Sequence, residues 1–268
     1  MTSPQLWAIS DLHLAYEQNR RLFETLRARP NDWLILAGDI AEKLADLERS
    51  FVAATERFAR VIWVPGNHEL WSMDDAPELR GQAKYDAVVA LARKHGVLTP
   101  EDPFPRFATS SGERVIAPLF LLYDYSFRPP EVPDDGAIEW AREAGLMCSD
   151  EYRLYSDPFA TKIAWCHARV RDAERRLSAI SEPTVIINHF PLRYDLVFLP
   201  AIPRFSIWCG TRLTESWHTR FRAEVVVSGH LHVRGTRHID GVRFEEVSLG
   251  YPRQWRGEDI NVYLRRIL

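Results

Sequence analysis

Five short apolar runs in this sequence each end in residues that commonly bind metals, and this repeated pattern constrains the fold more than any other feature. The runs cover residues 6–9, 33–37, 61–64, 184–187 and 225–227. Their apolar residues are consecutive rather than alternating, as in strands that are buried on both faces. Apolar residues at spacings of three and four predict helices over 44–58 and 159–180. Further strands are predicted at 233–238, 242–247 and 261–266, so we expect an alternating α/β fold with added antiparallel strands.

Side chains of the metal-binding type follow the end of each run. They are Asp11-Leu12-His13, Gly38-Asp39, Gly66-Asn67-His68-Glu69, Asn188-His189 and Gly229-His230-Leu231-His232. Ligands bind outside the carboxyl ends of the strands in open α/β sheets, so these distant groups can converge. Alternate residues of an extended segment point to the same side, which lets Asp11 and His13 face one centre. A glycine directly precedes three of the five groups, where the chain turns sharply or approaches another segment closely.

The chemistry of this set favours two metal ions. It contains carboxylates, imidazoles and one amide oxygen but no thiolate, which suits manganese, iron, zinc, cobalt or nickel without choosing among them. The ligand-type positions are too many for one ion, and two divalent ions about 3.5–4 Å apart can share a carboxylate. The positive charge of two such ions exceeds the negative charge of Asp11 and Asp39. The remaining positive charge attracts a phosphate anion and stabilises the charge that develops during its displacement.

From residue 5 to about 235, the order and spacing of these motifs resemble those of the calcineurin-like metallophosphoesterase superfamily. The resemblance implies a four-layer α/β/β/α sandwich and two divalent or trivalent metal ions, with manganese, iron or zinc expected. It implies a first metal held by Asp11, His13, Asp39 and His232, and a second held by Asp39, Asn67, His189 and His230. Asp39 would bridge the two ions. Many members have Asp where this chain has Glu69, for which we expect a local structural role.

The implied reaction is direct hydrolysis of a phosphoester, either a monoester or a diester. Metal coordination lowers the pKa of water from 15.7 toward ~7, and the resemblance implies that a hydroxide between the metals attacks phosphorus in line. The expected catalytic residues are Asp39, Asn67 and His68. His68 would contact the phosphate or protonate the leaving group. The expected substrate is a small molecule or a nucleotide-type phosphoester.

Two other function classes remain open on the sequence alone. One is a nuclease or protein phosphatase that acts on a macromolecule, and the other is an inactive scaffold of the same fold. The net charge of −3 and the lack of a basic stripe argue against a nucleic acid partner. The complete ligand set argues against a scaffold. The sequence does not indicate an oligomeric state.

The chain is expected to avoid membranes and to reside in the cytoplasm. No uncharged apolar run approaches the ~20 residues that a membrane helix needs, and no signal peptide is recognisable at the start. The three cysteines, Cys148, Cys166 and Cys209, lack a Cys-x-x-Cys spacing. Their low and odd number suits a reducing compartment.

We expect residues 1–268 to form a single metallophosphoesterase domain with an insertion or cap at about 123–157. This stretch is the least regular part of the sequence, with three prolines and five aromatic residues, and we expect it to overhang the site. Asp157-Pro158 is predicted to begin the following helix, with aspartate as the N-cap and proline at the first helical position.

Four residues near the motifs are candidate substrate contacts. Trp71 and Trp208 are placed to stack on a flat group, although packing beneath the loops is the alternative for both. Arg193 and Arg204 follow His189 in a proline-rich loop and are placed to bind a second phosphate or a carboxylate. A solvated loop face is the alternative for the two arginines.

Overall fold

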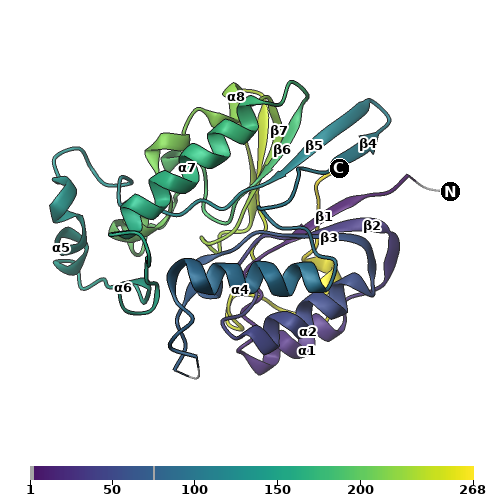
Figure 1. The fold of residues 1–268 in the computed structure, drawn as a ribbon, viewed down its shortest axis with the longest axis horizontal. Coiled ribbons are helices and arrows are strands. Elements are labelled where there is room, and N and C mark those ends of the chain that lie inside the picture. The colour runs from purple at the N-terminus through teal and green to yellow at the C-terminus, as the bar shows by residue number, and fades with distance from the viewer. Residues whose placement is uncertain (1–2, 75) are drawn as a thin grey trace.

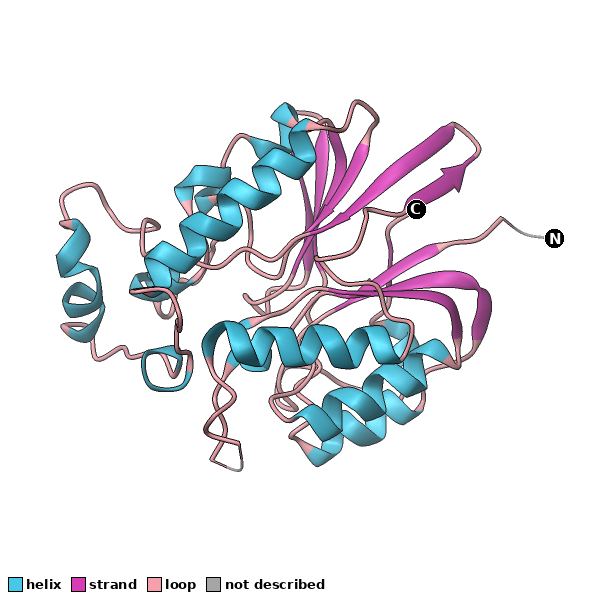
Figure 2. Cartoon of the chain, in the orientation of Figure 1, coloured by secondary structure: helices cyan, strands magenta, loops and turns pink. Residues whose placement is uncertain are grey.

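Two β-sheets stack face to face and carry helices on their outer faces (Figures 1 and 2). This computed structural model describes residues 3–74 and 76–268. The strand orders are β10-β1-β2-β3 and β4-β5-β6-β7-β9-β8. The strands are β1 (Leu6–Ile9), β2 (Arg29–Leu36), β3 (Phe58–Trp63), β4 (Arg106–Thr109), β5 (Gly112–Pro118), β6 (Thr184–Ile187), β7 (Ala223–Ser228), β8 (Gly235–Ile239), β9 (Val242–Glu246) and β10 (Arg265–Arg266). The architecture confirms the α/β/β/α sandwich that the resemblance implied.

The helices divide between the two outer faces. Helices α1, α2 and α4 lie on the side of the first sheet, and α7 and α8 lie on the side of the second (Figure 1). The α-helices are α1 (Glu17–Glu24), α2 (Leu44–Thr55), α3 (Asn67–Leu70), α4 (Gly81–Lys94), α5 (Ala137–Arg142), α6 (Asp150–Arg153), α7 (Lys162–Ser178) and α8 (Trp217–Arg220). Short 3-10 helices cover Asp134–Gly136, Tyr194–Leu196, Pro203–Trp208, Arg212–Thr214 and Ile260–Val262.

The central strands run parallel, so their carboxyl ends meet at one end of the sandwich. In the first sheet β1 pairs with β2 and β2 with β3, both in parallel. In the second sheet β5, β6, β7 and β9 are parallel neighbours. Among the described strands, antiparallel pairing is limited to β10 with β1, β4 with β5, and β8 with β9. The loops that follow β1, β2, β3, β6 and β7 therefore have the placement that the sequence predicted.

Burial on both faces explains why the strand sequences are continuously apolar. Along β2, Leu34 and Leu36 belong to the layer between the first sheet and its helices. Ile35 and Ala37 belong to the layer between the two sheets. All four side chains are fully buried. Each strand thus contributes to two cores, which stabilise the sheets against each other and against the helices.

Several predicted element bounds are wrong. Strands β2, β3 and β7 begin before the apolar runs because strand pairing extends to residues that are polar or exposed. The predicted strand at 261–266 begins instead in the 3-10 helix Ile260–Val262, which Asp259 caps by accepting a hydrogen bond from Asn261 N, and only Arg265 and Arg266 pair as β10. Helix α7 does not begin at Pro158. Thr161 is its N-cap and accepts a hydrogen bond from Ala164 N at 3.0 Å.

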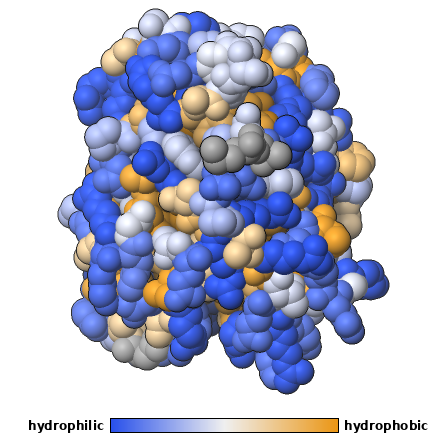
Figure 3. All heavy atoms as spheres, turned by 90° about the vertical axis from the view of Figure 1, so that its right-hand side faces the viewer, coloured by the Kyte–Doolittle hydropathy of each residue, from blue (hydrophilic) through white to orange (hydrophobic). Residues whose placement is uncertain are grey.

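The end of the molecule that carries both termini lies opposite α5 and α6 (Figure 1). Its surface is mainly hydrophilic, with hydrophobic side chains in small areas between charged ones (Figure 3). Within residues 3–74 and 76–268, none of the helices has both the length and the apolar character needed to cross a bilayer.

Candidate metal centre

The loops at the carboxyl ends of the strands bring the predicted ligands together. Three overlapping groups have ligand atoms within 4.8 Å of one another: Asp11 with His13 and His232; His13 with Asp39 and His68; and Asp39 with His189 and His230. Asn67 lines the same cavity as Asp39 and His230. Residues separated by more than two hundred positions therefore form one cluster.

The side chains of the cluster lie at or near hydrogen-bonding distance from one another. His232 Nε2 lies 3.0 Å from Asp11 Oδ1 and 3.1 Å from His13 Nε2. His189 Nε2 lies 3.4 Å from Asp39 Oδ2. Burial opposes ionisation of Asp11, yet His232 and His189 lower its pKa below the usual value. His189 in turn has its pKa raised to about 10, because Asp39 and Asp11 outweigh the effect of burial.

Unpartnered buried atoms show that these residues fit a metal centre. Asn67 Oδ1, His189 Nε2 and His230 Nε2 are buried, and none of the described residues provides them with a hydrogen-bond partner. A buried polar atom without a partner costs free energy, and native structures contain few of them. The His189 and His230 rings lie 5.2 Å apart. Metal coordination would satisfy all three atoms.

The second nitrogens of two imidazoles are held in the way typical of metal ligands. His189 Nδ1 donates to Ala37 O at 2.9 Å, and His232 Nδ1 donates to Gln254 Oε1 at 2.8 Å. A hydrogen bond from Nδ1 fixes the tautomer and directs the Nε2 lone pair into the site. Both histidines therefore present Nε2 toward the carboxylates.

The backbone at the ligands adopts the left-handed region that non-glycine residues usually avoid. The residues concerned, with φ from 44° to 72°, are Asp11, His13, Asp39, His230 and His232. Such conformations cost energy and cluster at functional sites. The ligand carboxylates also lie so close to two glycines that no larger residue fits there. A Cβ on Gly66 would lie 2.1 Å from Asp39 Oδ1, and one on Gly229 would lie 2.3 Å from Asp11 Oδ2.

Glu69 has the local structural role that the sequence predicted. Its carboxylate accepts hydrogen bonds from the backbone nitrogens of Asp39 at 2.9 Å, Ile40 at 2.6 Å and Gly66 at 2.7 Å. Burial and the nearby Asp39 raise the pKa of Glu69 to about 7. The residue ties the loop after β2 to the loop after β3 and thereby holds Asp39 in place.

His68 pairs with a carboxylate that sequence reasoning missed. Its Nδ1 lies 2.8 Å from Glu42 Oε1, and its Nε2 lies 3.8 Å from Asp39 Oδ2. Burial alone would lower the pKa of His68, but Asp39 and Glu42 raise it to about 9. Glu42 lies three residues after Asp39 in the same loop, and this proximity in sequence was the available signal.

Asp150 is a second residue that the sequence did not reveal. It begins α6 in the 123–157 segment and is fully buried. Its carboxylate accepts hydrogen bonds from Asn67 Nδ2 at 2.9 Å, Trp71 Nε1 at 2.7 Å and Tyr123 OH at 3.0 Å. The bond to Asp150 therefore uses the Asn67 amide nitrogen and leaves its oxygen available to a metal ion.

Comparison with known proteins identifies the family. The sequence signature of calcineurin-like phosphoesterases matches residues 4–234. This chain belongs to that family. The family uses a binuclear metal centre, and the protein is a metal-dependent hydrolase of phosphoesters.

A Mycobacterium tuberculosis protein and one more distant structure are similar to this phosphoesterase. "[Acyl-carrier-protein] phosphodiesterase PptH" of that organism is 46% identical over 270 residues, which is 99% of this chain and 83% of the relative. The crystal structure of "Phosphopantetheinyl Hydrolase (PptH)" from the same organism has a TM-score of 0.95 and 45% identity, covering 99% of this chain and 96% of that one. The protein TT1561 of Thermus thermophilus has a TM-score of 0.45 and 16% identity, over 92% of this chain and 90% of that one.

A cavity of about 510 Å³ opens over the candidate metal ligands of the phosphoesterase. Asp39, Asn67, His68, His230 and His232 form its base. Its walls come from residues 147–149 of the predicted cap, the apolar loop 198–202, and a C-terminal loop with Tyr251, Arg253 and Gln254. The lining of the cavity therefore includes elements outside the motif loops.

Of the four candidate substrate contacts, one lines this cavity. Trp71 does so, with its ring 3.8 Å from that of His68. Trp208 is fully buried and donates to Glu151 Oε1. Arg193 binds Asp195 and Glu215 O, and Arg204 binds Trp140 O and Glu143. These last three side chains serve packing and local ion pairs rather than lining the cavity.

Proposed function

We propose that this phosphoesterase hydrolyses the phosphodiester that attaches the phosphopantetheinyl group to acyl carrier protein. The observation that carries this proposal is the likeness to PptH over 99% of the chain, with a TM-score of 0.95. The likeness thus extends beyond the metal-binding motifs to the cap and the C-terminal loop that wall the cavity. The substrate is then a small phosphoester group carried on a protein, rather than the free small molecule that we expected from the sequence.

The ligand clusters support two metal positions. We propose that Asp11, His13, Asp39 and His232 hold the first ion, and that Asp39, Asn67, His189 and His230 hold the second. Support comes from the grouping of ligand atoms within 4.8 Å and from the unpartnered atoms of Asn67, His189 and His230. Asp39 belongs to two of the three groups, as a bridging ligand must.

Bound metal ions would supply Lewis-acid stabilisation of the phosphoryl oxygens and an acidified water. The chain itself supplies proton transfer and orientation. His68 donates its Nε2 proton to the departing oxygen of the carrier protein, while its Nδ1 stays bonded to Glu42. The bond from phosphorus to that oxygen breaks, the oxygen of water joins phosphorus, and phosphopantetheine leaves with the phosphate.

The 123–157 segment serves as the cap of the single domain in this proposal. Its residues Met147, Cys148 and Ser149 line the cavity, and Asp150 bonds to Asn67. The cap therefore forms part of the substrate site and also supports a proposed metal ligand. We further propose a cytoplasmic location, which the three free, buried cysteines support.

The test is incubation of the metal-loaded protein with holo-acyl carrier protein, followed by intact mass measurement. The proposal expects conversion to apo-carrier protein and release of free phosphopantetheine. The Asp39→Asn variant, which lacks one negative charge at the proposed bridge, is expected to convert at least 100-fold more slowly. Turnover of bis(p-nitrophenyl) phosphate without any conversion of holo-carrier protein would reject the substrate and leave the reaction class intact.

A further inference from the structure

A second pocket adjoins the catalytic cavity and is not used by the reaction described above. It has a volume of about 310 Å³, within the range of about 300–1,000 Å³ for small-ligand sites. Phe198, Leu231 and Val233 line both spaces, so they form a common wall. Leu231 stands between His230 and His232 in the chain, so this common wall belongs to the loop that carries two of the candidate metal ligands.

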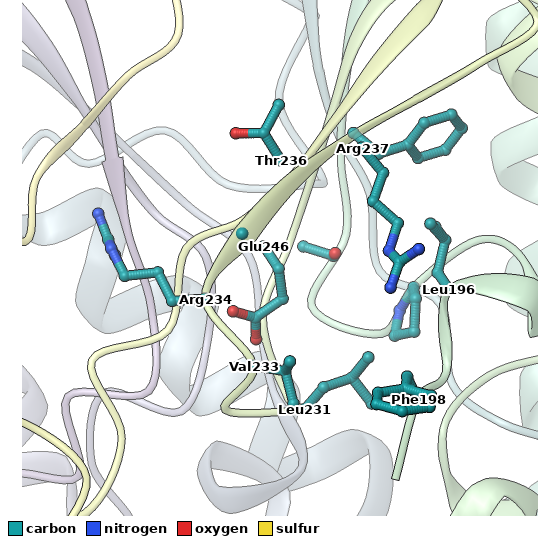
Figure 4. Close-up of a pocket in the computed structure, with 12 residues that line it drawn as sticks. Leu196, Phe198, Leu231, Val233, Arg234, Thr236, Arg237 and Glu246 are labelled. Atoms are coloured by element: carbon teal, nitrogen blue, oxygen red, sulfur yellow. The ribbon is translucent and has the colours of Figure 1, made fainter. Parts of the chain in front are cut away.

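The pocket combines an apolar lining with one cation and one carboxylate (Figure 4). Arg237 extends from β8 toward Leu196, and Glu246 turns its carboxylate toward Val233. Among the described residues, no hydrogen bond or ion pair engages the Arg237 guanidinium. Arg234 differs, because it points away from the pocket and donates to Val247 O at 3.2 Å. Arg237 is thus an available donor, whereas the Glu246 carboxylate already accepts hydrogen bonds from Ser248 N and Ser248 Oγ and keeps only its remaining lone pairs for a ligand.

We propose that this side pocket binds the pantetheine arm of the substrate while the phosphate lies at the metal cluster. The inference rests on the function proposed above. The arm is covalently attached to the phosphate, so its binding site must be close to the candidate metal ligands. The side pocket meets this condition because it shares Phe198, Leu231 and Val233 with the catalytic cavity. The catalytic cavity itself then remains open for the carrier protein.

The chemistry of the arm matches the lining. Pantetheine carries two methyl groups on one carbon, which suit the apolar wall of Phe198 and Leu231. It also carries amide carbonyls, which accept hydrogen bonds from Arg237, and amide N–H and hydroxyl groups, which donate to Glu246. Because a guanidinium only donates, Arg237 selects for a ligand with acceptor groups along the arm.

The experiment compares two substrates of the metal-loaded protein: holo-acyl carrier protein, which has the arm, and bis(p-nitrophenyl) phosphate, which lacks it. For Arg237→Ala, the ratio of kcat/KM for the first to that for the second is expected to fall about tenfold. This is the size expected for the loss of one charge-assisted hydrogen bond. Arg171→Ala is the matched control: this exposed arginine of α7 is outside both pockets, and the ratio is expected to stay within twofold.

A second variant tests the pocket by filling it. Leu196→Trp places a larger side chain in the pocket and is expected to lower the same ratio at least tenfold. Leu213→Trp is its control, since Leu213 is 51% exposed and lines neither space. Calorimetric titration with pantetheine alone gives a readout that needs no turnover. Its affinity is expected to fall about tenfold in Arg237→Ala.

The outcomes separate this inference from the proposed function. Conversion of holo-carrier protein with an unchanged ratio in both pocket variants would overturn the subsite and leave the function standing. Pantetheine binding that depends on Arg237, without conversion of holo-carrier protein, would overturn the function and uphold the subsite. Absence of pantetheine binding together with absence of conversion would overturn both.

Discussion

The Asn67 amide nitrogen donates to Asp150 Oδ1 at 2.9 Å, although the two residues are 83 positions apart. This bond joins the cap to the loop after β3. It leaves Asn67 Oδ1 buried without a hydrogen-bond partner among the described residues, at a position that lines the same cavity as Asp39 and His230. Asp150 also accepts from Trp71, which stacks on His68, so the same carboxylate supports the residue expected to protonate the leaving group.

Loss of the Asp150 carboxylate is therefore expected to weaken metal binding. Asp150→Ala leaves Asn67 Nδ2 without its acceptor and should lower metal affinity about 10–100-fold, as loss of a partner of a ligand typically does. Asp150→Asn keeps one acceptor oxygen and should lose less. Competition with a chelator measures both. Asp135→Ala, at an exposed position of the same segment, is the control and should match wild type; equal affinity in all three variants would refute this role.

The His68–Glu42 pair is expected to affect turnover rather than metal content. His68→Ala should lower kcat by roughly 10²–10⁴ on a diester, the usual contribution of a general acid. Glu42→Gln should cause a smaller loss, because a neutral amide no longer favours the protonated imidazole. Metal content by elemental analysis should stay at the wild-type level. Glu48→Gln neutralises the carboxylate of a similar pair with His95 on the surface and should change kcat less than twofold.

Removal of metal is expected to lower thermal stability. At metal concentrations of about 100 Kd, binding to the native state contributes about 2.7 kcal/mol. For a domain of this size each kcal/mol corresponds to about 2–4 °C in Tm. Chelator-treated protein should thus unfold at least ~5 °C below the protein reloaded with manganese, iron or zinc. Equal Tm values would contradict the interpretation of the unpartnered imidazole and amide atoms.

A methyl group at Gly66 is expected to displace Asp39. The φ of −95° at Gly66 is ordinary for any residue, so the added Cβ acts only through its 2.1 Å approach to Asp39 Oδ1. Gly66→Ala should lower kcat at least 100-fold. Gly96→Ala is the opposite case, with a φ of +73° and open space around the Cβ. It should cost about 1 kcal/mol in stability and leave kcat unchanged.

Prediction from sequence succeeded where a pattern is local. Along β2, consecutive apolar residues indicate burial on both faces, because neighbouring side chains of a strand point to opposite sides. Asp39 follows directly at the end of this run, and the parallel arrangement of strands then brings it to the common edge. Residue type and position in the chain were enough for this part of the site.

Prediction was less successful where residue type leaves several contacts open. Arg193 and Arg204 have the chemistry of phosphate ligands, but in the structure Arg193 pairs with Asp195, two residues away, and Arg204 pairs with Glu143 of the 123–157 segment. Pro158 has the residue type of a first helical position, but Thr161 provides the cap of α7. In each case side-chain geometry chose among contacts that the residue types alone leave equally possible.

The sequence by itself determined the five apolar strands, the candidate ligand types and their order, because strand periodicity and the chemistry of side chains are properties of neighbouring residues. Only the tertiary structure decided that Asp150 bonds to Asn67 and that Arg237 lines a pocket together with Leu231. The first of these relationships joins segments far apart in the chain. The energies that set both are hydrogen bonding and burial between packed elements, which residue spacing does not encode.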